Sequence, residues 1–461
     1  MRVAEALPVP RARMAAGSRL ARSEIVLAIF ALAIAYGVFA QGAFYWAQAT
    51  FVAGAFLVLL VLTGAGAFRG SAPLLAGFGL LAVGLLVSTV ANGTWSIPAR
   101  LPLVSLILAC CVLLVVRTLV TWGLRSDLLE LASWFGAAVA AMGIVGVAWH
   151  AAALAQEAPP MWRLAGTFTY VNAAASFLVL TLPATLLRCA RRPGATSRFL
   201  LYLTFAGLLA TVSRGGVVAG AVMAAVLLAT GQRGLLRHGV RALAGAVVAF
   251  AGLVPSIADA QPHPLPALLG FAAGAGLAVA SVRVKLPARA RRALQGGGVV
   301  VVIALAAVPL LTHRDSILAS RINFRSEARL TNWSETIHHI AGDPILGSGP
   351  GTLELYFPAG AATIRTPFAH NEYLQTLAET GVVGLVSVLA AIALFATTAI
   401  RRRPRDDRPH ERMVWAAATA CCAGFLAQSG VDFTWRFPIL IVLAFSWLAI
   451  ATTRGAEEET R

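Results

Sequence analysis

Apolar runs of membrane length follow one another along almost the whole chain and are separated by short polar segments. The runs are rich in Leu, Ala and Val without apolar/polar alternation, which favours helices over the strands of a membrane barrel. A helix needs about 20 apolar residues to cross a bilayer. We therefore predict an all-α, polytopic membrane protein with about 14 (range 12–14) transmembrane helices. The spans are expected near 24–42, 49–67, 73–90, 101–118, 129–150, 168–187, 199–213, 216–231, 240–257, 265–283, 297–312, 376–400, 413–431 and 437–453.

The main exception to this pattern is a long polar segment, Arg321–Gly384, just before the last apolar runs. Inside it, apolar residues recur with the spacing of one helix face, and Asp343-Pro344 is expected to end that helix. We expect it to lie on the membrane surface with its polar side facing an aqueous cavity. The apolar side holds Leu330, Trp333, Ile337 and Ile340, and the polar side holds Arg329, Asn332, Thr336 and His339. The glycine-rich stretch 347–351 is predicted to be a turn, because no βαβ unit surrounds it.

The composition agrees with a membrane protein: 58% of the residues are hydrophobic, 12% are charged, and the mean hydropathy is +0.78. The net charge of +17 could indicate nucleic-acid binding. Basic residues in cytoplasmic loops explain it better, because they set the orientation of membrane helices. We expect membrane lipids, and no nucleic acid, among the partners.

The distribution of basic residues predicts an orientation. With a cytoplasmic N-terminus, the cytoplasmic segments hold 28 of the 37 basic residues, which supports cytoplasmic N- and C-termini. The first apolar run is long and no convincing cleavage site follows it, so we expect an uncleaved first span. The long loop and Arg214 then lie on the same outer side. The predicted parts are a cytoplasmic segment 1–23, N-terminal transmembrane helices 24–158, central helices 159–312, a long outer loop 313–375 containing short helices, C-terminal helices 376–453 and a cytoplasmic tail 454–461.

Arginines provide the first candidate site residues. Arg214 stands in a Ser-Arg-Gly-Gly turn between two apolar runs, and an arginine at the membrane is costly unless it has a function. Its planar fork fits phosphate oxygens, although it could also simply reach the lipid headgroups. Arg321, Arg325 and Arg329 are spaced as one helical stripe that could bind a diphosphate, lipid headgroups or nearby glutamates.

His370 is the candidate general base. It precedes a helix expected to begin at Asn371 or Glu372, and a helix N-terminus disfavours an imidazolium and so keeps the ring able to accept a proton. A backbone hydrogen bond at the helix entry is the alternative. Asn371 could orient the base or only cap the helix; Glu372 and Glu379 are weaker candidates.

Metal and redox chemistry are not expected. His338-His339 has no third ligand at a recognised spacing. The five cysteines lie within or at the ends of apolar runs without CxxC spacing. We predict no metal and no cofactor.

Several short motifs together resemble the O-antigen ligase and polymerase family of bacterial membrane glycosyltransferases, over roughly residues 160–435. Their order and their placement around a long outer loop carry the resemblance. They are Gly166–Asn172 with Pro183, Ser213-Arg214-Gly215, Arg329 with Trp333, Asp343–Gly349, His370–Leu374, Glu379-Thr380-Gly381 and Asp432 with Pro438. About fourteen spans are somewhat more than the ligase pattern of about twelve.

The resemblance implies a glycan donor carried on undecaprenyl diphosphate and an acceptor hydroxyl on a glycan, on lipid A core or elsewhere. It implies a metal-independent, inverting transfer in the periplasm, next to the inner membrane of a bacterium. Carried over by motif, His370 is the base, and Arg214 and Arg329 bind the diphosphate. We place Arg321, Arg325, Asn371, Glu372, Tyr170 and Asn172 among the substrate-binding residues.

The alternatives use the same residues differently. A repeat-unit polymerase shares the chemistry of a ligase and differs in the acceptor. A flippase for lipid-linked sugars would place charges near the membrane midplane, often in paired halves, and the chain shows no such halves.

Overall fold

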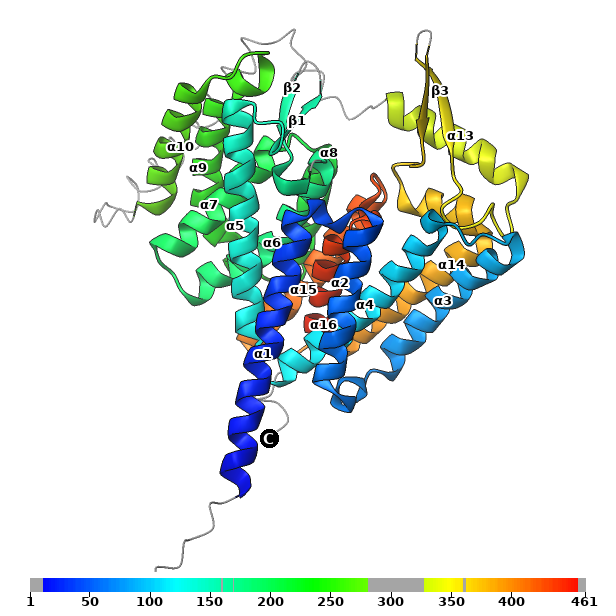
Figure 1. The fold of residues 1–461 in the computed structure, drawn as a ribbon. Coiled ribbons are helices and arrows are strands. Elements are labelled where there is room, and N and C mark those ends of the chain that lie inside the picture. The colour runs from blue at the N-terminus through cyan, green and yellow to red at the C-terminus, as the bar shows by residue number, and fades with distance from the viewer. Residues whose placement is uncertain (1–10, 159–160, 169, 281–326, 360–361, 455–461) are drawn as a thin grey trace, which may run out of the picture.

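The computed structural model describes residues 11–158, 161–168, 170–280, 327–359 and 362–454, which form a bundle of long helices (Figure 1). The first half of the bundle consists of α1 (Arg11–Phe39), α2 (Trp46–Thr63), α3 (Ala72–Asn92), α4 (Ile97–Thr121), α5 (Arg125–Trp149), α6 (Val171–Arg191) and α7 (Ala195–Ala210). The second half consists of α8 (Arg214–Ala229), α9 (Arg233–Ala258), α10 (Pro264–Val279), α13 (Glu327–Gly342), α14 (Glu372–Arg401), α15 (Pro409–Ser429) and α16 (Pro438–Thr452).

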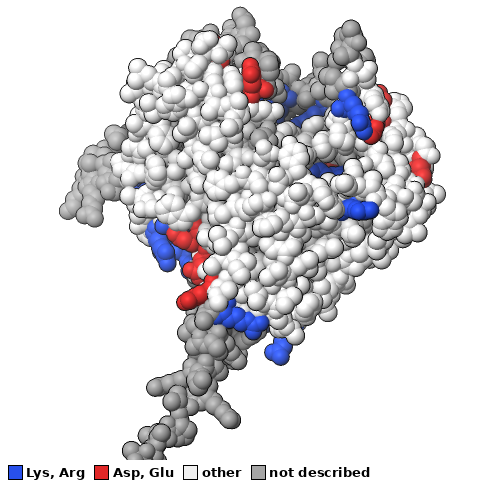
Figure 2. All heavy atoms as spheres, in the orientation of Figure 1, with Lys and Arg blue, Asp and Glu red and all other residues white. Residues whose placement is uncertain are grey.

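The helices confirm the predicted spans. Every expected span within the described residues coincides with one helix, and the span 297–312 lies outside them. Eight of the described helices are long and apolar enough to cross a membrane, and α7, α8, α10 and α16 are shorter apolar helices. The protein is therefore an all-α polytopic membrane protein. Figure 2 shows a broad, mostly uncharged surface between the charged side chains near its two ends.

Small residues allow the closest helix pairs to approach. On α3 and α14, a methyl group added to Gly84 would lie 3.1 Å from the Cα atom of Gly384. On α9 and α10, one added to Gly252 would lie 2.9 Å from the Cα atom of Gly270. Apolar side chains gain little by leaving lipid for a helix interface, so close packing of this kind stabilises membrane bundles.

Helix α14 is broken at Gly381, whose φ of 64° is left-handed. A side chain there would collide with the chain before it, since an added Cβ would lie 2.1 Å from the Ile345 carbonyl oxygen. The amide of Val382 instead donates to the Pro344 carbonyl at 2.9 Å. The break thus admits the segment that follows α13, and Asn92 of α3 fixes it by donating to the Gly347 carbonyl at 3.0 Å.

Two β-hairpins were not predicted. The first joins β1 (Ala155–Ala158) and β2 (Met161–Leu164), and the second joins β3 (Leu355–Ala359) and β4 (Ala362–Thr366); both are antiparallel. The long loop therefore holds a hairpin as well as the expected helix, α13. The hairpins, α13 and the start of α14 lie at one end of the bundle, and the first residues of α1 and the end of α16 lie at the other (Figure 1).

Helix α13 ends at Gly342, as Asp343-Pro344 predicted. Its polar side faces the protein, since Asn332 and Thr336 are buried. Its apolar residues Leu330 and Ile337 are exposed. The exposed apolar side agrees with a helix on a membrane surface. The polar residues Asn332 and Thr336 pack into the protein, whereas an aqueous cavity was expected on that side.

Candidate active site

The Asp432 carboxylate is the centre of the candidate site. It follows α15 and is only 1% exposed. Its Oδ1 atom accepts hydrogen bonds from the Tyr170 hydroxyl at 2.8 Å and from the Phe433 amide at 3.0 Å. His370 Nδ1 lies 3.2 Å from the same oxygen, and Arg329 lies 3.3 Å from Oδ2. A buried carboxylate is costly unless it is paired, and these groups supply the pairing.

His370 occupies the predicted position at the entry to α14. Its φ of 54° is left-handed, so the backbone turns sharply before the helix begins. Asn371 then caps the helix, because its side-chain oxygen accepts from the amides of Tyr373 and Leu374. Capping thus accounts for the Asn371 side chain. When the Nδ1–H group of His370 donates a hydrogen bond to Asp432, the Nε2 atom of the same ring is free to accept a proton.

Arg214 is the first residue of α8 and is half-buried. The preceding residue, Ser213, is the N-cap of this helix: its hydroxyl accepts from the Gly216 amide at 3.2 Å. The predicted turn is therefore a helix start. A helix N-terminus favours an anion, so both the positive end of α8 and the Arg214 guanidinium suit a phosphate at this position.

A chain of hydrogen bonds connects the start of α8 to Asp432. Ser213 donates to the Asn172 side-chain oxygen at 2.9 Å, and Asn172 donates to the Tyr170 hydroxyl at 2.8 Å. Tyr170 then donates to Asp432. Burial, followed by the adjacent Asp432 carboxylate, raises the pKa of Tyr170 well above its usual value, so the phenol remains a neutral donor.

Aromatic rings hold this region in place. Phe433 stacks on Phe368 with ring centroids 4.2 Å apart and on Tyr170 at 4.8 Å. The His370 ring meets the Phe433 ring edge to face at 4.9 Å. Because Phe433 directly follows Asp432, the stack fixes the backbone that presents the carboxylate.

A second buried charge cluster lies beside the first. Arg436 binds both carboxylate oxygens of Glu379 at 3.0 and 3.1 Å, and Gln375 donates to Glu379 at 2.7 Å. Burial disfavours the charge on Arg436, but the neighbouring carboxylates of Glu379 and Glu372 outweigh this and raise its pKa. The Glu372 carboxylate accepts from the Trp435 amide.

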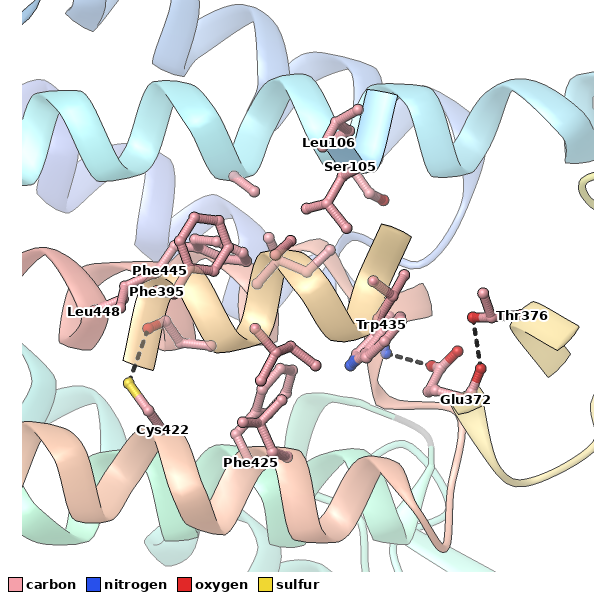
Figure 3. A pocket seen from close by; sticks show the side chains of 18 of the residues that line it. Ser105, Leu106, Glu372, Thr376, Phe395, Cys422, Phe425, Trp435, Phe445 and Leu448 are labelled. Atoms are coloured by element: carbon pink, nitrogen blue, oxygen red, sulfur yellow. Dashed lines mark hydrogen bonds between the residues drawn. The ribbon is translucent and has the colours of Figure 1, made fainter. Parts of the chain in front are cut away.

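Glu372 and Trp435 lie at one end of an apolar cavity of about 510 Å³ (Figure 3). The cavity runs between α4, α14, α15 and α16, and Phe395, Phe445 and Leu448 line its far part (Figure 3). Glu372 therefore contacts this cavity, whereas His370, two residues earlier, contacts Asp432.

The structure brings together most of the candidate residues. Tyr170, Asn172, Arg329 and His370 form one hydrogen-bonded group around Asp432, and Arg214 adjoins it through Ser213. Arg321 and Arg325 lie outside the described residues. The sequence predicts no role for Gln375 or Arg436, and it offers Asp432 only as part of a family motif without a role. A single acid and a single base in the junction between the last two apolar runs are the signal that it contains.

His338 and His339 do not point toward a common site. His339 Nε2 lies 2.9 Å from the Ser348 hydroxyl, and His338 is exposed. Among the described residues, no group of three or more His, Cys, Asp or Glu side chains is placed to hold a metal ion.

The fold and the site define a polytopic membrane protein in which a half-buried histidine pairs with a buried aspartate, with arginines at the same end of its helices. Residues 267–389 match the family model described as O-antigen ligase. This match supports the resemblance of the chain to the O-antigen ligase/polymerase family of bacterial membrane proteins. The match includes Arg329 and His370, whereas Tyr170, Arg214 and Asp432 lie outside the matched segment. No curated protein matches the chain significantly.

The family match supports a broad class of activity. Its members are glycosyltransferase-like enzymes of ligase or polymerase type that use lipid-linked glycan donors and glycan acceptors in the membrane. The protein is therefore a bacterial membrane protein with a ligase- or polymerase-like function in envelope polysaccharide synthesis.

Proposed function

We propose that this protein transfers a glycan from undecaprenyl diphosphate to an acceptor hydroxyl, with inversion at the anomeric carbon and without a metal ion. The observation that carries the proposal is the pairing of His370 with the buried Asp432, which also pairs with Arg329. Hydrogen bonds through Tyr170, Asn172 and Ser213 connect the same carboxylate to the start of α8, where Arg214 lies. The family match supports the choice of a lipid-linked glycan as donor.

In the proposed step, the acceptor hydroxyl displaces the diphosphate from the donor sugar. His370 Nε2 takes the proton of the acceptor hydroxyl, whose oxygen attacks the anomeric carbon of the donor sugar. The bond between this carbon and the diphosphate oxygen breaks, and undecaprenyl diphosphate leaves. Asp432 stabilises the imidazolium that forms. Arg214 and Arg329 stabilise the negative charge that develops on the diphosphate.

The proposed location is the inner membrane, with the N- and C-termini in the cytoplasm and the site on the periplasmic side. The excess of arginine in the segments on the opposite side supports this orientation.

The test is His370→Ala in purified, reconstituted protein, assayed for release of undecaprenyl diphosphate from a lipid-linked glycan. Loss of a general base lowers kcat by about 10²–10⁴-fold, and we expect a fall in this range. His338→Ala is the matched control, since His338 is an exposed histidine of the same loop. Full turnover by His370→Ala, with normal insertion, would remove His370 as the base.

Ligase and polymerase differ only in the acceptor. We favour the ligase, whose acceptor is a different molecule from the donor. Supplying the donor alone should then give no lengthened lipid-linked product, and adding lipid A core should start release. Lengthened lipid-linked glycan from the donor alone would assign the polymerase activity instead.

A further inference from the structure

The turn between α7 and α8, which delivers Arg214 to the site, has a strained backbone. Val212 has a φ of 48°, in the left-handed region. A β-branched residue is rarely found there, because its side chain collides with its own backbone. Such a conformation persists only when the surroundings hold it in place.

Arg163 of β2 supplies this restraint. Its Nε atom donates to the Thr211 carbonyl at 2.9 Å, and its NH2 group donates to the Val212 carbonyl at 3.1 Å. Arg163 as a whole residue is 9% exposed, so these bonds are largely shielded from water, and shielding strengthens them. The planar fork binds both carbonyls at once, on the two residues before the N-cap Ser213.

The hairpin that carries Arg163 is itself firmly placed. Leu164 of β2 packs against Gly143 of α5, where an added Cβ would lie 2.2 Å from its side chain. Across the hairpin, Gln156 is the partner of Arg163 and accepts a hydrogen bond from the Val171 amide at 3.1 Å. One cross-strand pair thus contacts both the start of α6 and the turn before α8.

We propose that Arg163 is a positioning residue: it holds the α7–α8 turn in its strained form and so places Arg214 beside the Asp432–His370 pair. This rests on the proposed function for its consequence in catalysis, because Arg214 acts on the leaving diphosphate. Arg163 acts on the reaction through the backbone carbonyls of the turn, and therefore through the placement of Arg214.

The test combines two substitutions. Misplacement of a catalytic group by about 1 Å costs up to ~10²-fold in rate, so Arg163→Ala should lower kcat about 10-fold to 100-fold and change KM much less. Glycine adopts a positive φ without strain. Val212→Gly should therefore restore much of the kcat of Arg163→Ala, although it replaces neither hydrogen bond.

The matched control is Arg117→Ala. Arg117 is also a buried arginine that donates to backbone carbonyls, of Thr452 and Gly70, but at the opposite end of the bundle. The Arg117→Ala variant should have a lower Tm and an unchanged kcat.

If Arg163→Ala inserts poorly, Arg163→Lys is the alternative, because it retains the charge and one donor. It should show a smaller loss of kcat that Val212→Gly also restores.

A second readout is independent of the reaction. The Gly216 amide binds the Ser213 hydroxyl at the start of α8, so its hydrogen exchange reports on the turn. Arg163→Ala should accelerate exchange in residues 213–217, and Arg117→Ala should not. Wild-type kcat and exchange in Arg163→Ala would overturn the proposal, as would a loss that Val212→Gly fails to restore. If wild-type protein transfers no glycan, the exchange result still decides the positioning role while the proposed function fails.

Discussion

At the scale of single residues, the site depends on one carboxylate with several partners. Asp432 contacts a tyrosine, a histidine and an arginine that come from three separate parts of the chain. Its negative charge is therefore needed twice: to orient His370 and to balance Arg329. A change that keeps the shape of the side chain but removes its charge separates these roles from simple packing.

Asp432→Asn should lower kcat for glycan transfer by about 10²–10⁴-fold, the range in which general-base catalysis contributes. The amide can still accept hydrogen bonds but cannot stabilise an imidazolium. Single-turnover release of undecaprenyl diphosphate measures the effect. Glu354→Gln is the control, since Glu354 is a partly exposed acid of the long loop that pairs with Arg365. Equal rates in both variants would exclude the charge of Asp432 from the reaction.

Tyr170→Phe removes one hydroxyl and leaves the ring stacked on Phe433. The change leaves Asp432 and Asn172 each without one hydrogen bond, which costs about 1–3 kcal/mol. We expect kcat/KM to fall by roughly 5–30-fold, the ratio that one or two kcal/mol represents. Asn172→Ala should lower kcat/KM to a similar degree. The result would contradict the network if Tyr170→Phe were active and Asn172→Ala alone were impaired.

The sequence singled out His370, Arg214 and Arg329 because each is a polar residue in unusual surroundings. Asp432 belongs to one of the motifs that carry the resemblance, but its role was not predicted: it is a single acid in a short junction between two apolar runs, and junctions commonly carry charges. Its importance depends on the proximity of segments 62 and 103 residues away along the chain. The same holds for Arg436 and Glu379, which are 57 residues apart.

At the scale of elements, the helices were predictable and the hairpins were not. Membrane-length apolar runs have few alternatives to a helix, because lipid offers no partners for backbone groups. The strands β1 to β4 are only four or five residues long, and their apolar/polar pattern is too short to distinguish them from loop. The glycine-rich turn 347–351 was predicted, but the break in α14, against which this segment packs, was not.

Gly381→Ala should destabilise the protein by about 1–3 kcal/mol, because alanine is strained at this φ and its methyl group would overlap the Ile345 carbonyl. Thermal unfolding in detergent would show this as a lower Tm. Gly79→Ala on α3 is the control, since an added methyl group there meets nothing within 4 Å. A Tm that fell equally in both variants would show that the break in α14 has no special role.

At the scale of the whole molecule, hydrophobicity and charge predicted the number and order of the helices described. They also predicted that Arg214 and His370 lie at the same end of the bundle, which the hydrogen bonds through Ser213, Asn172 and Tyr170 agree with. The hydrophobic pattern could not predict which helices are neighbours, because this depends on side-chain packing between segments that are distant in the sequence.

The orientation in the membrane can be tested with single cysteines. A membrane-impermeant maleimide applied to intact cells with a permeable outer membrane should label Glu354→Cys in the long loop. It should not label Asp406→Cys, which is exposed between α14 and α15 at the other end. The unsubstituted protein, with its five native cysteines, gives the background. The opposite pattern would place the site in the cytoplasm.

The position of Asp432 also bears on biosynthesis. Chain elongation produces Tyr170, Arg214, Arg329 and His370 before it produces the carboxylate around which they gather. Until α15 has entered the membrane and residue 432 has followed it, the nascent protein carries these groups without their common counterion. Assembly of the proposed site therefore coincides with insertion of the last two helices, and a partly inserted chain holds the groups of the proposed transferase without the carboxylate that connects them.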